Sequence, residues 1–197
     1  MSIASVERPS VSMLARDLAG ERWRISVAYG TLQHTTLSMG EHRVDNFVET
    51  VIDNYRELHQ RLHQAVEGLD TGALNWVPCK DANSIGVLVI HTMASEMDWL
   101  HIAAGRPFPR DRESEFRARA AHPLALHQRI DEVMAAIPDL LKTAYEEDLA
   151  TRRQRERDGR VETALWCILH SVEHTAEHVG QVELTRQLLP ATPQSPT

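Results

Sequence analysis

Three histidines near the carboxyl end of the chain recur at every fourth residue: His170, His174 and His178. In a helix, residues four apart are neighbours on one face, so two adjacent imidazoles can point at one ion. All three cannot share an ion, because a rise of 1.5 Å per residue places His170 roughly 12 Å from His178. The run therefore offers one chelating pair, and a tetrahedral or octahedral metal ion needs further ligands from elsewhere in the chain.

A further histidine, His91, stands in the middle of the most apolar stretch of the chain, Gly86-Val-Leu-Val-Ile-His91-Thr-Met. An imidazole in such surroundings needs a polar partner, since burying it without one costs about 1–3 kcal/mol. Ligation of a metal ion by side chains from facing helices would supply that partner. A hydrogen bond to a neighbouring helix would supply it as well, and the His174–His178 pair allows the same alternative of two hydrogen-bonded, partly buried histidines.

The segment His174-Thr-Ala-Glu177-His178 also fits the H-x-x-E-H pattern of inverted zinc peptidases, in which the glutamate is the general base. Such a site needs another carboxylate ligand from a separate element. Only 19 residues follow His178, and the one acid among them is Glu183. Because Glu183 would lie on the same helix about 140° round from His178, we reject a peptidase site.

Other candidates for chemistry are expected to have structural roles. His59 and His63 form a second i,i+4 pair, but they lie in the polar run Arg-Glu-Leu-His-Gln-Arg-Leu-His-Gln, which predicts a solvated surface. Cys167 lies two turns before His174, where a small buried thiol is expected rather than a nucleophile. The arginines at positions 152, 153, 155, 157 and 160 predict a charged linker, with the binding of an anionic co-substrate as the alternative.

Composition narrows the class of protein. The chain of 197 residues is long enough for one domain with a proper core, and its formal net charge of −7 argues against a nucleic-acid partner. It contains no apolar run of the ~18 residues that a membrane span needs, and its first residues lack the pattern of a signal peptide. Its two cysteines, Cys79 and Cys167, do not make a disulfide framework. We therefore expect a cytoplasmic protein with no membrane partner.

Four helices are expected to position the histidines, because apolar residues recur at three- and four-residue spacing in four stretches. Ser84 suits the N-cap of the second helix, and Pro138 should kink or break the third. In the fourth helix the expected core residues are Leu165, Ile168, Leu169, Val172 and Val179. The predicted helices run from Val44 to Gly68, from Ile85 to Ala104, from Pro123 to about Tyr145, and from about Glu162 to Leu189.

These elements predict an all-α protein whose domain is a four-helix bundle over residues 43–189. A charged linker from Glu146 to Arg160 precedes the last helix, and no strand-rich region is expected after residue 43. Residues 1–42 form an N-terminal extension that we expect to be largely disordered, although Trp23-Arg-Ile-Ser-Val-Ala-Tyr29 alternates like a short strand without a partner. Residues 190–197 form a C-terminal tail.

Together these features resemble the DinB-like superfamily of bacterial metal-binding four-helix bundles, also called YfiT-like. The resemblance covers about residues 43–189, and its most specific part is the terminal motif His174-x-x-x-His178-x-Gly180-Gln181. Val179 stands where many members carry arginine, and residues 1–42 have no counterpart in the family. The other matching parts are Leu74-Asn-Trp76-Val-Pro78, Ser84-Ile85-Gly86 followed by His91, and Glu96-Met-Asp-Trp99 continuing to Gly105.

The resemblance implies a divalent metal ion held by His91, His174 and His178. An all-histidine set suits Zn, Ni, Fe and Cu, of which we expect Zn or Ni. Family members include mycothiol- and bacillithiol-dependent S-transferases and a maleylpyruvate isomerase. The resemblance therefore implies a metal-dependent S-transferase whose partners are a small-molecule thiol and an electrophilic substrate. A non-catalytic metal-binding or interaction bundle and a metal-dependent hydrolase are the alternatives, and a homodimer is compatible with each of them.

Overall fold

The computed structural model describes residues 11–13, 25–27 and 39–190, with side chains from residue 46 onward. The contacts divide the chain into two units between Met39 and Gly40. In the first unit, strand β1 (Val11–Met13) pairs antiparallel with β2 (Ile25–Val27). The strand around Ile25, which was expected to have no partner, therefore has one. The partner was not predicted because the segment Val11–Met13 is too short to give a strand pattern. The expected disorder of residues 1–42 concerns mainly residues outside the described ranges and stays a prediction.

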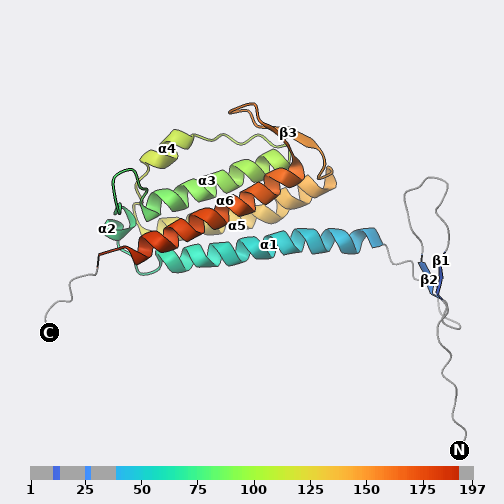
Figure 1. Cartoon of the computed structure of the whole chain (residues 1–197), viewed down its shortest axis with the longest axis horizontal. Coiled ribbons are helices and arrows are strands. Elements are labelled where there is room, and N and C mark those ends of the chain that lie inside the picture. Colours follow the sequence, from blue (N-terminus) through green and yellow to red (C-terminus); the bar gives the residue numbers. More distant parts are fainter. Residues whose placement is uncertain (1–10, 14–24, 28–38, 191–197) are drawn as a thin grey trace, which may run out of the picture. The chain divides into compact units, whose positions relative to one another are not determined.

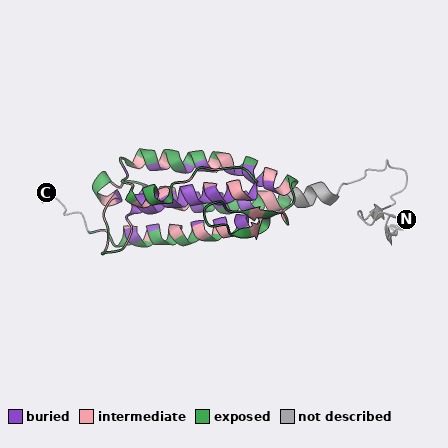
Figure 2. Ribbon diagram, turned by 90° about the horizontal axis from the view of Figure 1, so that it is seen from above, coloured by how far each residue is buried: buried purple, intermediate pink, exposed green. Residues whose placement is uncertain are grey.

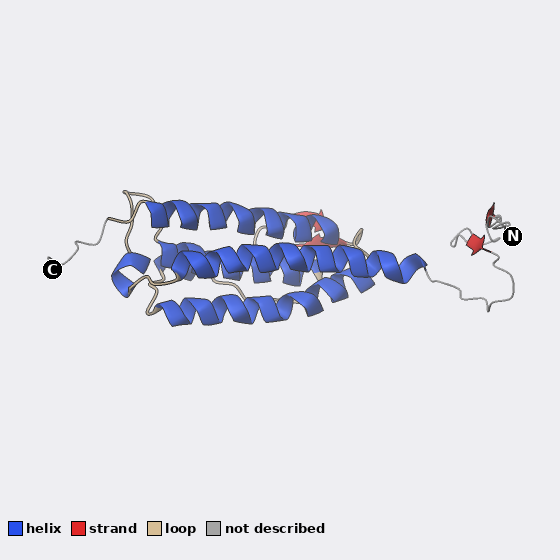
Figure 3. Ribbon diagram, turned by 90° about the horizontal axis from the view of Figure 1, so that it is seen from below, coloured by secondary structure: helices blue, strands red, loops and turns tan. Residues whose placement is uncertain are grey.

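In the second unit four long helices form a bundle, which confirms the predicted all-α fold (Figures 1 and 3). Two short helices, α2 (Thr71–Leu74) and α4 (Arg112–Arg117), lie in the connections. Buried residues line the inward faces of the long helices (Figure 2). No helix in residues 39–190 is long and apolar enough to cross a membrane. The four long helices are α1 (Met39–Val66), α3 (Ile85–Ala103), α5 (Pro123–Glu146) and α6 (Ala164–Gln187).

Helix α3 packs against four other helices, α2, α4, α5 and α6. Most of its residues are buried, which explains why its sequence is apolar on every side. The predicted N-cap is confirmed, because the Ser84 hydroxyl accepts a hydrogen bond from the backbone N–H of Val87 at 3.3 Å. At the other end Gly105 has a φ of +65°, and the N–H of Arg106 donates to the carbonyl of His101. This Schellman arrangement fixes the end of the helix.

The first turn of α3 packs closely against two connecting segments at Gly86. A Cβ atom at this position would lie 2.7 Å from the Cβ of Ala120 and 3.1 Å from the carbonyl oxygen of Leu74. Only a glycine leaves enough room for that approach. The glycine of the Ser84-Ile85-Gly86 motif therefore holds the start of α3 against both connections.

The charged linker between α5 and α6 contains a hairpin that the sequence did not predict. Strand β3 (Arg152–Gln154) pairs antiparallel with β4 (Val161–Thr163), so that Arg153 lies opposite Glu162. Strands of three residues alternate too briefly to give a pattern. Tertiary contacts help to hold the hairpin, since Arg153 Nε donates to the carbonyl oxygen of Ala103 at the end of α3.

Two expectations about the last two helices need correction. Helix α5 continues through Pro138 to Glu146, so of the predicted kink or break the break does not occur. In α6, Leu165 and Leu169 are 36% and 53% exposed, although both were expected in the core. Small and polar side chains occupy much of the buried face instead, so apolarity alone was a poor guide to its orientation. The buried residues of α6 are Ala164, Cys167, Ile168, Ser171, Thr175, Val179, Val182 and Thr185.

Candidate metal centre

The three histidines that the sequence singled out lie together between α3 and α6. His91 is in the middle of α3 and is 3% exposed, whereas His174 and His178 are partly exposed and one turn apart on α6. One ring nitrogen from each residue lies within 4.8 Å of one from each of the other two. Across residues 46–190, no other group of three His, Cys, Asp or Glu residues has this arrangement.

The spacing of these rings suits one ion. The Nε2 atoms of His174 and His178 are 3.2 Å apart, and the ring centre of His91 lies 5.4 Å and 4.9 Å from theirs. Two nitrogens that are each about 2.1 Å from one zinc ion can be at most about 4.2 Å apart. The α6 pair therefore has the separation of two ligands of one ion, with His91 facing it from α3. An all-imidazole donor set of this kind fits a divalent transition-metal ion.

Polar partners orient two of the three rings. His91 Nδ1 lies 2.8 Å from a carboxylate oxygen of Glu115, and His178 Nδ1 lies 2.8 Å from the side-chain oxygen of Gln181. Because both partners offer an acceptor, each Nδ1 carries the hydrogen, and the lone pair of each ring is on Nε2. An outer acceptor that fixes the tautomer of a ligating histidine is a usual feature of metal sites.

The electrostatics of the site keep the α6 pair unprotonated at neutral pH. Burial, together with the nearby His178 and His91 rings, lowers the pKa of His174 to about 3. Burial also lowers the pKa of His178, although its contact with Gln181 opposes the shift. Metal ions bind the neutral imidazole, so no proton has to leave these two rings when an ion enters.

Glu115 is a buried carboxylate that stays ionised. Burial by itself would raise its pKa, but hydrogen bonds from Arg110 and His91 more than offset burial and lower the pKa to about 2. Arg110 Nε and Nη2 donate to the two carboxylate oxygens of Glu115 at 2.7 and 2.9 Å. The ring of Phe116, the next residue of α4, lies 4.6 Å from that of His91 between ring centres. Helix α4 therefore supplies the surroundings of His91 on the side away from the bundle core.

The third histidine of the α6 run, His170, lies outside the triad, in agreement with the helical rise. Its ring packs 4.5 Å from Trp166 and 4.8 Å from Trp99, measured between ring centres. Its Nδ1 is 3.6 Å from a carboxylate oxygen of Glu173. His170 therefore extends the site as an aromatic neighbour of His174.

His59 is buried, contrary to the predicted surface position. It is 3% exposed, and its Nε2 lies 2.9 Å from an oxygen of Glu96, a carboxylate buried inside the bundle. The hydroxyl of Thr175 donates to the other oxygen of Glu96 at 3.0 Å. His59 stands four residues after Tyr55 and three before Leu62, and both of these are fully buried. That spacing places it on the apolar face of α1, so the polar neighbours in sequence were misleading.

His63 is partly buried, and its Nδ1 lies 2.6 Å from Nδ1 of His127 on α5. A hollow of about 370 Å³ lies beside this pair and includes no residue of the triad. Its lining mixes imidazole, amide, guanidinium and carboxylate groups with one methionine. The lining residues are Arg56, His59, Gln60, His63, Gln64, Asp131 and Met134.

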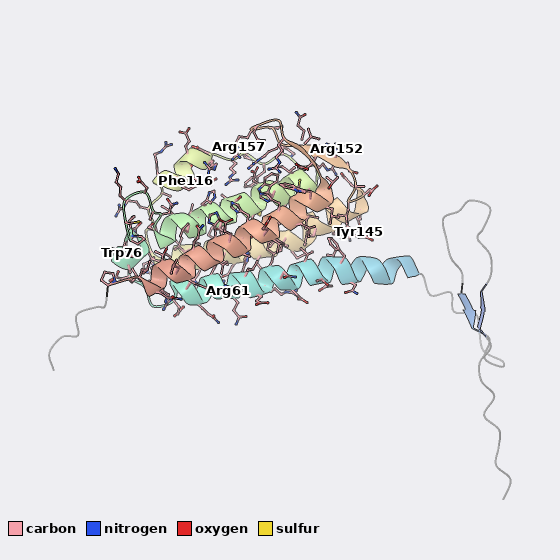
Figure 4. The ribbon with its side chains drawn as sticks, in the orientation of Figure 1. Arg61, Trp76, Phe116, Tyr145, Arg152 and Arg157 are labelled. Atoms are coloured by element: carbon pink, nitrogen blue, oxygen red, sulfur yellow. The ribbon has the colours of Figure 1, made fainter. Side chains whose placement is uncertain are left out.

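The remaining candidates have structural partners. Cys167 is buried, and burial raises the pKa of its thiol to about 11, so it cannot be the nucleophile near neutral pH. Glu183 accepts two hydrogen bonds of 2.8 Å from Arg61, which lies on α1 (Figure 4). Several linker arginines already have acidic partners: Arg153 with Glu147, Arg155 with Asp98 and Asp158, Arg157 with Asp158, and Arg160 with Glu162.

Sequence reasoning missed the residues that support the triad. Arg110 and Glu115 lie between the predicted second and third helices, and nothing in their local pattern marks them as buried. Gln181 was part of the terminal motif, but its role was not predicted. Its spacing was a usable signal, because a residue three positions after His178 lies on the same helix face.

Fold and site together define a four-helix bundle with a candidate metal centre on α3 and α6. A family model described as the DinB superfamily matches residues 54–182. The match covers more than half of the 197 residues, and the chain belongs to this superfamily. A search of curated proteins found no match to the chain.

Solved structures share the fold at low sequence identity. YfiT from Bacillus subtilis, described as a probable metal-dependent hydrolase with an unusual four-helix bundle topology, is 15% identical with a TM-score of 0.59, covering 80% of this chain and 92% of that one. A DinB-like protein from Bacillus cereus is 14% identical with a TM-score of 0.57, covering 71% and 90%. A conserved protein from Enterococcus faecalis is 15% identical with a TM-score of 0.56, covering 71% and 95%.

Proposed function

We propose that the chain is a metal-dependent S-transferase, in which His91, His174 and His178 hold one divalent ion and a low-molecular-weight thiol attacks an electrophilic substrate. The observation that carries the proposal is the facing set of three imidazoles, of which the two on α6 are unprotonated and partly exposed. Three protein ligands leave coordination positions open, as a catalytic site requires. A divalent ion there would lower the pKa of a thiol or water that binds to it.

The nucleophile has to come from outside the chain. Cys167 lies two turns before His174, but it is buried and its pKa is raised to about 11. Cys79, the other cysteine, is exposed in the segment between α2 and α3 and belongs to no group with the triad. A small thiol of the mycothiol or bacillithiol type would supply the sulfur. Its carbon–sulfur bond would form as the leaving group departs from the electrophile, and the thiol proton would pass to solvent.

Metal-dependent hydrolysis is the second candidate function, with water in place of the thiol. The observation in its favour is the similarity of fold to YfiT, which is described as a probable metal-dependent hydrolase. At 15% identity that similarity supports the architecture rather than the reaction. A non-catalytic bundle, in which the ion ties α3 to α6, is less well supported because the two α6 rings are partly exposed.

Metal content and thiol conjugation together test the proposal. The purified protein should contain one divalent ion per chain by elemental analysis, and His174→Ala should lose it. His122→Asn is the matched control, because it removes an imidazole that is not part of the triad and keeps a side chain that can cap α5.

The metal-loaded protein should accelerate the conjugation of a bimane or chloronitrobenzene electrophile with a small thiol, and mycothiol, bacillithiol, glutathione and cysteine should be compared. The rate should disappear with His178→Ala or on chelation and persist with Cys167→Ser. If no thiol gives a metal-dependent rate while ester or amide hydrolysis does, the hydrolase is the correct function. If neither reaction is metal-dependent and chelation lowers the melting temperature, the ion has a structural role.

A further inference from the structure

A buried chain of ion pairs runs from the β3–β4 hairpin to the triad. Arg155 Nη2 donates to Asp98 Oδ2 at 2.8 Å, and Arg110 Nη1 donates to the same oxygen at 3.0 Å. Arg110 also donates to both oxygens of Glu115, one of which accepts from His91 Nδ1 at 2.8 Å. None of the four charged side chains is more than 12% exposed.

These four side chains come from separate parts of the fold. Asp98 lies on α3 seven residues after His91, Arg110 precedes α4, Glu115 is within α4, and Arg155 directly follows β3. These four side chains carry two positive and two negative charges, so the chain of ion pairs is neutral overall. Buried charges need this balance, since a buried ion that loses its partner is strongly destabilising.

Arg110 is the cation that both carboxylates share. Its Nη1 donates to Asp98, whereas its Nε and Nη2 donate to Glu115. The position of the guanidinium therefore depends on its attraction to both carboxylates. While Arg155 donates to Asp98 and balances its charge, Arg110 can remain close to Glu115. Arg110 then holds the Glu115 carboxylate where it accepts a hydrogen bond from His91. Without Arg155, Arg110 would be the one cation left beside Asp98 among the described residues, and Arg110 would be drawn away from Glu115.

We propose that Arg155 is a positioning residue for the metal centre, acting through Asp98, Arg110 and Glu115 on the orientation of His91. The inference rests on the proposed function, because it assumes that His91 is a metal ligand. Outer partners of ligating histidines commonly change metal affinity by 10–100-fold when they are removed. Arg155 extends that influence to a hairpin that supplies none of the three ligands.

The competing explanation is that Arg155 merely anchors the hairpin. Its guanidinium lies 4.2 Å from the ring centre of Trp99, which is a favourable contact in its own right. An anchoring role predicts a loss of stability when Arg155 is replaced, with no change at His91. The two roles are therefore separated by measurements that report on the site rather than on folding.

The experiment compares Arg155→Gln with Arg157→Gln, a matched control on the same hairpin whose side chain is 45% exposed and pairs with Asp158. Cobalt(II) affinity is measured by competition with a chromophoric chelator, and the melting temperature is recorded for each variant. We expect Arg155→Gln to weaken cobalt binding about tenfold or more and Arg157→Gln to change it less than about twofold. Cobalt affinity unchanged in Arg155→Gln would overturn the proposal, whatever the melting temperature.

A double variant separates charge balance from anchoring. Asp98→Asn combined with Arg155→Gln removes one charge of each sign and leaves Arg110 to Glu115 alone. Arg155 is missing from both variants, but in the double variant Asp98 no longer carries the charge that attracts Arg110. We therefore expect the double variant to recover most of the cobalt affinity lost in Arg155→Gln. If the double variant binds cobalt no better than Arg155→Gln, positioning through charge balance is wrong.

The metal-free protein gives an independent readout. The hydrogen on His91 Nδ1 should give a hydrogen-bonded imidazole resonance by NMR, which Glu115→Gln should shift. Arg155→Gln should shift it in the same direction, and Arg157→Gln should leave it unchanged. A shift without any cobalt binding, even in the wild type, would support the positioning of His91 and refute the proposed function. The absence of a shift in Arg155→Gln would refute the positioning role.

Discussion

Single residues of the triad could be predicted from the sequence, but their supports could not. His174 and His178 are four apart in a helix, and His91 is an imidazole in an apolar run, so each is marked by its own neighbours. Glu115 belongs to a helix of six residues in a polar connection, where no periodic pattern can indicate burial. Its role depends on contacts with residues 24 positions earlier and five positions earlier, which only the tertiary fold brings together.

The ionised state of Glu115 predicts a pH dependence of stability in the metal-free protein. Its folded pKa of about 2 is below the ordinary value near 4.3, so its contribution is present above the unfolded pKa and is lost as the pH falls through the folded pKa. Between pH 5 and pH 2 the free energy of unfolding should fall by up to about 3 kcal/mol from this group. Glu115→Gln should lack that part of the fall. Urea unfolding at several pH values measures it, and identical slopes for both proteins would contradict the prediction.

At the scale of elements, the long helices were predictable because caps and apolar spacing are local signals. Ser84 fixed the start of α3, and Pro123 the start of α5, at the residues where the structure has them. The β3–β4 hairpin and the orientation of α6 were not predictable in the same way. The hairpin is held partly by hydrogen bonds from Arg153 and Arg155 to residues of α3. Helix α6 buries the hydroxyl of Thr175, whose partner Glu96 lies across the bundle on α3.

The close approach at Gly86 gives a prediction for α3. Gly86→Ala should lower the free energy of unfolding by about 1–3 kcal/mol, because the added methyl would lie 2.7 Å from the Cβ of Ala120. Gly180→Ala is the matched control, since no atom lies within 4 Å of a Cβ there and the position is exposed in a helix. The control should gain about 0.5–1 kcal/mol. Equal effects of the two substitutions in chemical denaturation would show that Gly86 is not a packing requirement.

At the scale of the whole molecule, the fold class followed from four amphipathic or apolar stretches of helix length. The sequence could not give the arrangement in which α3 contacts α5 and α6, because side-by-side placement depends on which faces fit together. The superfamily match at residues 54–182 agrees with the predicted domain from 43 to 189 without testing its limits. Cytoplasmic location and a homodimer stay predictions.

The N-terminal extension provides a test at this scale. Within residues 46–190 the buried hydrophobic core runs from Val51 to Val182, and a chain starting at Met39 keeps all of these residues. We expect its melting temperature to differ from that of the full chain by less than about 5 °C, as measured by differential scanning calorimetry. A larger drop would mean that residues 1–38 pack on the bundle and that the Trp23–Tyr29 segment has a structural role.

The short side chains on the buried face of α6 have a consequence for metal selection. Cys167, Ser171 and Thr175 take less room than leucine would, and short side chains allow two helix axes to approach toward the lower end of the 8–10 Å range. The backbones of α3 and α6 are in extensive close contact. The gap between His91 and the α6 pair is therefore set by core packing. An ion held there would be selected for its radius by residues that it never touches.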